Sequence, residues 1–89
     1  MSLDLQMDEE LPEADLHGMT VYEAKHELDL ALDRASVQKE RAVRVIVGRG
    51  SGRLYSEMKT HLRGHKQVDR VVDSDAEFEL GAVLYAVIA

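Results

Sequence analysis

Two short segments of the sequence carry residue types that could act on a phosphate group. Asp15 and His17 are two positions apart, and the glycine-rich stretch 48–52 contains Arg49 and is followed by Arg53. A carboxylate beside an imidazole raises the basicity of the ring, and such a pair can position a water, coordinate a divalent metal or protonate a leaving oxygen. The alternative is a structural pair, in which Asp15 caps a turn and His17 donates to a backbone carbonyl.

The glycine-rich stretch predicts a loop that binds phosphate. It runs Gly48-Arg49-Gly50-Ser51-Gly52-Arg53. Glycines let backbone amides approach an anion closely, and the loop leads into an expected helix whose free N–H groups and dipole favour negative charge. Arginine side chains can give paired hydrogen bonds to phosphate oxygens, and Lys59 and Arg63 add basic groups further along the helix. The alternative is a tight strand-to-helix turn that needs glycine only for its shape.

Two nucleotide-binding motifs do not match this stretch. The Walker A motif requires a Lys-Ser or Lys-Thr pair after its last glycine, but Arg53-Leu54 follows Gly52. The dinucleotide fingerprint requires a small residue where Arg53 stands, because the helix packs closely on the strand at that point. A nucleotide cofactor is therefore not expected.

Length and composition limit the organisation of the chain. It has 89 residues, no cysteine and a formal net charge of -6. This length allows one domain, and the lack of cysteine excludes disulfides and a cysteine nucleophile and favours a cytoplasmic location. No apolar run approaches the roughly 20 residues that a membrane span needs. The acidic residues 1–12 predict a tail or linker, with a tag remnant at its start, ahead of a single domain over 13–89.

Basic residues are concentrated in the middle of the chain. Positions 41–70 hold eight basic and two acidic residues. This distribution predicts a basic face that suits DNA or RNA in spite of the acidic total. The alternative is that these bases pair with acids across the fold. His61 and His65 lie in the same stretch and are expected to be polar surface groups or phosphate contacts, and no cluster of histidines and carboxylates at metal-ligand spacing is expected.

The elements that must position these residues alternate between strands and helices. Strands are expected at 14–17, 43–47, 68–72 and 81–88, with helices from Thr20 to about 36 and from 53 to 63. The order β-α-β-α-β-β predicts an α/β two-layer sandwich, with a four-stranded mixed sheet in the order 1-2-4-3. Right-handed crossovers put both helices on one face and leave the other largely open. The carboxyl ends of the first two strands then bring the two candidate segments together.

The two segments resemble the signatures of a known family. Asp15-Leu16-His17-Gly18 resembles the Leu-Asp-Leu-His-Gly motif that opens the small MutS-related (Smr) domain, and strand 43–47 with the glycine loop resembles its His-Gly-x-Gly motif. The resemblance implies a domain that binds DNA or RNA and in many members nicks or cleaves it, in DNA repair, recombination or at the ribosome. By position, it implies Asp15 and His17 as catalytic candidates and Gly48, Arg49 and Gly50 as the phosphate-facing loop.

The sequence departs from these signatures at two positions. Ala14 stands where leucine is usual, and Val47 stands where the second motif carries histidine. Valine can neither donate nor accept a proton, so catalysis is more exposed to this change than binding. Three functions stay open: an endonuclease, a non-catalytic module that binds nucleic acid or the ribosome, and a protein-interaction domain that uses the apolar last strand and the open sheet face. A requirement for Mg²⁺ or Mn²⁺ also stays open, and no other cofactor is expected. The resemblance allows the domain to be part of a larger chain.

Overall fold

Four strands and two helices alternate along the chain in a computed structural model, in which residues 5–89 are described. The elements are β1 (Glu13–Asp15), α2 (Val21–Val37), β2 (Ala42–Ile46), α3 (Arg53–Arg63), β3 (Val68–Asp73), the 3₁₀ turn η1 (Glu77–Glu79) and β4 (Val83–Ile88). Two strands end earlier than the sequence predicts. His17 therefore lies in the loop after β1, and Val47 lies in the loop after β2.

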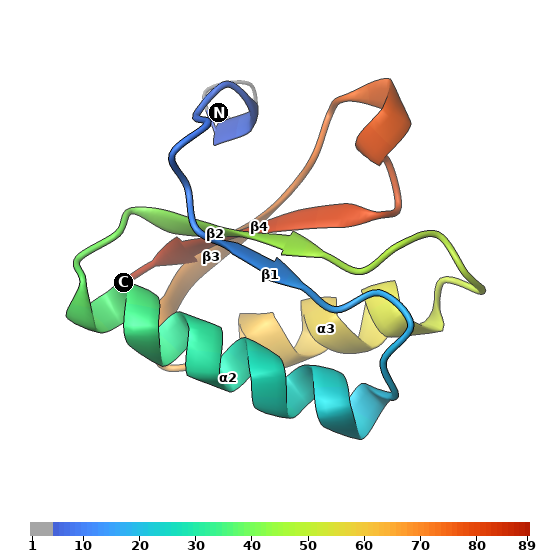
Figure 1. Ribbon diagram of the computed structural model, residues 1–89, viewed down its shortest axis with the longest axis horizontal. Coiled ribbons are helices and arrows are strands. Elements are labelled where there is room, and N and C mark those ends of the chain that lie inside the picture. The colour runs from blue at the N-terminus through green and yellow to red at the C-terminus, as the bar shows by residue number, and fades with distance from the viewer. Residues whose placement is uncertain (1–4) are drawn as a thin grey trace.

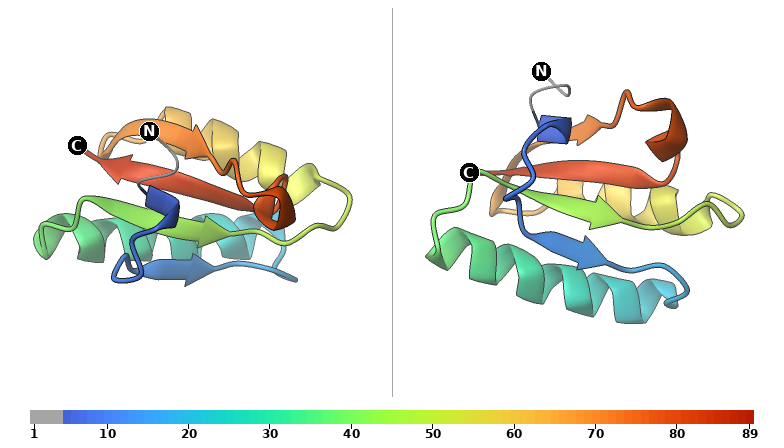
Figure 2. Two further views of the ribbon diagram at one scale, coloured as in Figure 1. Left: turned by 90° about the horizontal axis from the view of Figure 1, so that it is seen from above. Right: turned by 45° about the horizontal axis from the view of Figure 1, so that its top comes forward.

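The sheet has the predicted order, β1-β2-β4-β3. β1 and β2 are parallel, and β4 is antiparallel to both of its neighbours. Both helices cover the same face of the sheet, which confirms the predicted two-layer α/β sandwich (Figure 1). The further views show the same layering, with the loops after β1 and β2 at one end of the sheet (Figure 2).

Helix α2 begins at the capping box that the sequence predicts. The Thr20 hydroxyl accepts from the Glu23 amide at 3.1 Å, and the Glu23 carboxylate accepts from the Thr20 amide at 3.0 Å. A cap of this kind contributes about 1 kcal/mol. The buried stripe of α2 packs with α3 and the strands in one core. This core contains Ala24, Leu28, Leu32, Ala35, Val43, Val45, Met58, Leu62 and Leu84. This core fixes the strand ends from which the two candidate loops leave.

The sheet face opposite the helices is partly covered, and the prediction of a largely open face is wrong. Leu5 and Leu11 are buried there, in a cluster with Ala42, Val83 and Tyr85. Figure 1 shows the N-terminal segment on the side of the sheet away from α2 and α3. Part of the stretch that the sequence predicts to be an acidic tail or linker therefore packs on the sheet, because its two leucines remove apolar surface from water.

A charged group is also buried at this face. The Glu79 carboxylate accepts from the Ser74 hydroxyl at 2.6 Å and from the Tyr85 hydroxyl at 3.2 Å, and it pairs with Arg44. Burial alone would raise the pKa of Glu79, but the hydrogen bonds from Ser74 and Arg44 outweigh it and lower the pKa.

Within residues 5–89, neither helix has the length and apolar character to cross a bilayer.

Candidate nucleic-acid interface

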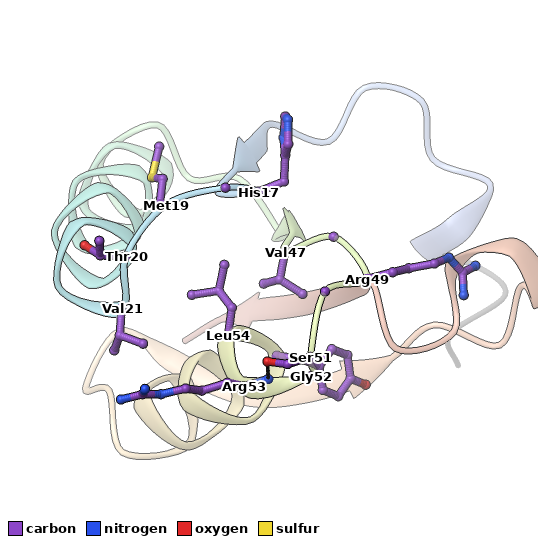
Figure 3. Close-up of a pocket in the computed structure, with 14 residues that line it drawn as sticks. His17, Met19, Thr20, Val21, Val47, Arg49, Ser51, Gly52, Arg53 and Leu54 are labelled. Atoms are coloured by element: carbon purple, nitrogen blue, oxygen red, sulfur yellow. Dashed lines mark hydrogen bonds between the residues drawn. The ribbon is translucent and has the colours of Figure 1, made fainter.

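A groove of about 660 Å³ lies where the loops after β1 and β2 meet the start of α3. The β1 loop gives one wall, and the glycine loop and the first turn of α3 give the other (Figure 3). The lining residues are His17, Gly18, Met19, Thr20, Val21, Val47, Gly48, Arg49, Gly50, Ser51, Gly52, Arg53, Leu54 and Tyr55. Among the described residues, these contain two arginines, one histidine and no carboxylate. The groove therefore suits an anionic ligand.

Close backbone contact holds the two loops together. The Leu16 amide donates to the Ile46 carbonyl at 2.7 Å, which continues the pairing of β1 with β2. Gly48 has a φ of +79°, and a Cβ on it would lie 3.1 Å from the Cβ of His17. Both the left-handed conformation and the close approach favour glycine at this position. The predicted convergence of the two segments is present, and Gly48 is the residue that allows it.

Asp15 and His17 form a hydrogen-bonded pair at the rim of the groove. His17 Nδ1 lies 2.6 Å from Asp15 Oδ1, and the His17 amide donates to the same oxygen at 3.3 Å. This hydrogen bond raises the pKa of His17 above its usual 6.5 and lowers the pKa of Asp15 below its usual 3.8. Because the carboxylate holds Nδ1, Nε2 is left for another partner, and the His17 side chain is 70% exposed. In Figure 3 the ring projects outward from the rim.

The start of α3 offers backbone donors beside the glycine loop. Its N-cap is Gly52, with a φ of +87° and no side-chain cap, and its first turn holds no acidic residue. The Ser51 hydroxyl accepts from the Arg53 amide at 3.3 Å. The remaining N–H groups of the first turn lack helical partners and, with the dipole, favour an anion. This is the feature that the glycine spacing predicts.

The two arginines of the loop have different surroundings. Arg49 donates through Nη1 to the Leu80 carbonyl at 3.2 Å and through Nη2 to the Phe78 carbonyl, so its guanidinium is directed at η1 and the residue after it. Figure 3 shows it pointing away from the groove, with Arg53 extending on the opposite side. The Arg53 guanidinium has no hydrogen-bond or ion-pair partner within residues 5–89. Arg53, and not Arg49, is thus placed to meet a ligand in this conformation.

Lys59 and Arg63 lie on α3 but do not line the groove. Lys59 donates to Asp73 at 2.9 Å and lies 5.7 Å from the centre of the Tyr55 ring. Burial, together with the hydrogen bond to Asp73, raises the pKa of Tyr55 to about 12. The sequence placed Lys59 and Arg63 with the loop because they share its helix, but they are further along that helix than the groove extends.

The broader prediction of one basic face over 41–70 is wrong. Arg41 pairs with Asp8, Arg44 with Glu13 and Glu79, Lys59 with Asp73, and Arg70 with its neighbour Asp69. Half of the eight bases are therefore neutralised locally, as the alternative expectation had it. The positive character that remains at the groove comes from the helix terminus and Arg53.

Val47 occupies the floor of the groove. Its side chain is only 4% exposed and belongs to the main core as well as to the groove lining. The position where the family motif carries histidine is thus next to the loop that holds His17, and here it supplies only apolar surface. Sequence reasoning did not single out Met19, Thr20, Leu54 and Tyr55, which also line the groove. Their positions beside the two motifs were the available signal.

The groove has no ready set of metal ligands. Mg²⁺ and Mn²⁺ are bound by oxygen donors, usually one or two carboxylates with substrate phosphates and waters. Asp15 is the carboxylate nearest to the lining residues along β1, and its Oδ1 is engaged by His17. The Asp15–His17 pair offers one carboxylate and one imidazole, which do not form a preformed cage for such an ion.

Comparisons with known proteins agree with this fold. The family model of the Smr domain matches residues 14–88. Endonuclease MutS2 of Thermus thermophilus is 37% identical over 65 residues, which are 73% of this chain and 9% of that protein. Endonuclease MutS2 of Staphylococcus epidermidis is 41% identical over 56 residues, which are 63% of this chain and 7% of that protein. The chain thus spans less than a tenth of the length of these curated relatives.

A solved structure resembles most of this chain. The crystal structure of the Smr domain of Thermus thermophilus MutS2 has a TM-score of 0.84 to this chain at 30% sequence identity. The match covers 89% of this chain and 99% of the other. Fold, paired motifs and family match agree, and the chain belongs to the Smr domain family.

Proposed function

We propose that this domain binds DNA or RNA at the groove and that His17 enables it to cleave a phosphodiester bond there. The observation that carries the proposal is an imidazole, held by a carboxylate, at the rim of a groove that contains no acidic side chain. The MutS2 relatives are named as endonucleases, which supports the same reaction.

Binding would use the backbone of the nucleic acid. The amides of the glycine loop and of the first turn of α3 would donate to phosphate oxygens, and Arg53 would add a charged, two-pronged donor. These contacts are local, so the net charge of -6 does not oppose them strongly at physiological ionic strength, where the Debye length is about 8 Å. Contacts of this kind position a strand without selecting its sequence.

Cleavage would use Nε2 of His17. A strand that lies across the rim brings a phosphodiester to this nitrogen, which can protonate the leaving oxygen or accept a proton from an attacking water. Asp15 is a positioning residue, because it holds Nδ1 and favours the protonated ring. The helix-terminal amides and Arg53 would stabilise the charge that develops on the phosphate, and one such donor typically contributes about 3 kcal/mol.

A second candidate is a module that binds nucleic acid or the ribosome without cleaving. Val47 favours it, because the groove floor supplies no second group for proton transfer. The amides and Arg53 do not depend on that position, so binding would persist without catalysis.

The MutS2 relatives are much longer than this chain, and we also propose that the domain acts inside a larger cytoplasmic protein, in DNA repair or recombination.

The test measures binding and cleavage in the same samples. Single- and double-stranded DNA and RNA are titrated across a salt series, and cleavage is scored with Mg²⁺, with Mn²⁺ and with EDTA. Cleavage that is lost in His17→Ala but kept in the surface control His26→Ala supports the enzyme. A steep salt dependence without cleavage by the unmodified chain supports the module. Absence of binding to any of the four ligands at low salt would overturn both.

A further inference from the structure

A second cluster of histidine and aspartate lies in the helix layer. His61 Nε2 is 2.7 Å from Asp29 Oδ1, and His65 Nε2 is 3.3 Å from the same oxygen. One ligand atom from each residue lies within 4.8 Å of the other two. The expectation that the chain has no such cluster at metal-ligand spacing is wrong. The available signal was the His-x3-His spacing of 61 and 65, which places two side chains on one face of a helical turn.

The fold brings these side chains together from two helices. Asp29 belongs to α2, His61 to the last turn of α3, and His65 follows the C-cap Gly64. The His65 amide donates to the Leu62 carbonyl at 3.1 Å, so the chain keeps turning beyond the end of α3. The two imidazole rings lie edge to face, with centroids 5.8 Å apart and planes at 72°. The cluster thus depends on the packing of α2 beside α3, which Figure 1 shows.

The burial of the cluster suits an ion that is held but reachable. The side chains of His61 and His65 are 23% and 15% exposed, and that of Asp29 is 50% exposed. The histidine rings are therefore largely fixed by packing, which lowers the conformational entropy lost when a ligand binds them. The half-exposed carboxylate leaves an entry from solvent.

The donor set is that of a late first-row metal. Two imidazole nitrogens and one carboxylate oxygen are ligands typical of Zn²⁺, whereas Mg²⁺ prefers oxygen ligands alone. In a tetrahedral Zn²⁺ site, ligand atoms lie roughly 3.4 Å apart, as follows from metal–ligand distances of about 2.1 Å. The His65–Asp29 distance of 3.3 Å already meets this value, and the His61–Asp29 distance of 2.7 Å would have to lengthen by about 0.7 Å.

One hydrogen bond opposes metal binding. The Gln67 amide donates to His65 Nδ1 at 3.1 Å, so in the neutral ring the proton is on Nε2. A metal bound at Nε2 would move that proton to Nδ1 and break this hydrogen bond. Because partners around a metal site usually orient its histidines, the affinity is expected to be lower than that of a structural zinc site with a prearranged surround.

We propose that Asp29, His61 and His65 bind one Zn²⁺ ion that links the middle of α2 to the C-terminal end of α3. Three protein ligands leave the fourth position of a tetrahedral site for water or for a donor from another molecule. The groove is formed by the opposite end of α3, at residues 53–55, so this site is separate from the proposed phosphodiester chemistry. The ion would bind the folded chain and thereby stabilise it.

The test uses the full 89-residue chain with ZnCl₂, and with MgCl₂ as the comparison ion. Calorimetric titration is expected to give one Zn²⁺ per chain and no Mg²⁺ binding, and excess Zn²⁺ is expected to raise the Tm. Asp29→Asn and His61→Ala should each weaken Zn²⁺ binding at least about tenfold and abolish the rise in Tm. His26→Ala and His17→Ala should bind Zn²⁺ as the unmodified chain does.

Several results would overturn the proposal. They are an unmodified chain that binds no Zn²⁺, an Asp29→Asn variant with unchanged affinity, and a His17→Ala variant that loses the ion. Circular dichroism establishes that each variant is folded before titration. Asp29→Asn keeps the inference falsifiable even when His61→Ala does not fold, because the Asp29 side chain is half-exposed and its replacement nearly isosteric.

Discussion

The two places where histidine meets aspartate in this domain use the same residue types for different chemistry. At the groove, one carboxylate holds Nδ1 of one exposed ring and leaves Nε2 without a protein partner among the described residues. In the helix layer, one carboxylate oxygen faces Nε2 of two largely buried rings, and His65 Nδ1 accepts from a backbone amide. The first arrangement can transfer a proton to or from a ligand. The second brings three ligand atoms to one point.

The difference follows from the backbone that carries each pair. Asp15 ends β1 and His17 lies in the turn that follows, where the His17 amide donates to Asp15 Oδ1 and both side chains are exposed to solvent. Asp29, His61 and His65 come from two packed helices, whose facing side chains point at one another. A strand end thus presents a pair to a ligand, whereas a helix interface directs its side chains inward.

The largest expected effect is that a histidine substitution in one cluster removes the property of that cluster alone. His17→Ala should reduce cleavage by about 10²–10⁴-fold, the usual contribution of a general acid or base, and should leave Zn²⁺ binding unchanged. His61→Ala should weaken Zn²⁺ binding and leave the rate of cleavage unchanged. Single-turnover cleavage and calorimetric titration of both variants check this. If either variant lost both properties while remaining folded, the two clusters would not be independent and the comparison would fail.

The next effect concerns the close contact that places His17. Gly48→Ala should destabilise the domain by about 2 kcal/mol or more, because alanine disfavours a φ of +79° and its Cβ would lie 3.1 Å from that of His17. Chemical denaturation measures the free energy of unfolding. Gly50→Ala is the matched control, since the backbone of Gly50 is not left-handed and a Cβ there would meet nothing within 4 Å. Equal losses in the two variants would contradict the contact argument.

A smaller effect separates the groove from the rest of α3. Arg53→Ala should weaken nucleic-acid binding and reduce the slope of log K against log salt by about 1, the value for one lost phosphate contact. Arg63→Ala, on the same helix but outside the groove lining, should change the slope less. Fluorescence anisotropy over a salt series provides both slopes. A larger change in Arg63→Ala would show that the nucleic acid binds outside the groove.

Sequence pattern predicted the parts of this structure that depend on local periodicity and connectivity. The capping box at Thr20, the sheet order and the convergence of the two loops are all confirmed. Each follows from spacing within a short segment or from the handedness of a crossover. The structure places Asp15 and His17 beside the glycine loop. The roles of these residues in binding and cleavage stay predictions.

The parts that sequence could not predict depend on partners far along the chain. Arg49 is an arginine in a glycine-rich loop, a residue type and position that favour phosphate binding. Its hydrogen bonds are instead accepted by the carbonyls of Phe78 and Leu80, about 30 positions away. Glu79 lies in a polar connection and is buried because Arg44, Ser74 and Tyr85 converge on it. Such pairings are set by the packed sheet, and no local spacing reports them.

The smallest expected effect tests Asp15 as a positioning residue. Asp15→Asn removes the carboxylate whose hydrogen bond raises the pKa of His17, so this pKa should fall toward 6.5. The ion pair is complete above the pKa of Asp15, which lies below 3.8, and its contribution is lost as pH rises through the pKa of His17, which lies above 6.5. NMR titration of the ring protons measures the shift directly.

The same variant distinguishes a catalytic pair from a structural one. If His17 transfers a proton during cleavage, the limb of the pH–rate profile that it governs should move to lower pH in Asp15→Asn, by the shift that NMR records. The exposure of both side chains makes the substitution mild for the fold, so the profile can be compared at equal stability. A pKa of His17 that falls while the profile stays in place would show that another group transfers the proton, and the groove pair would then be structural.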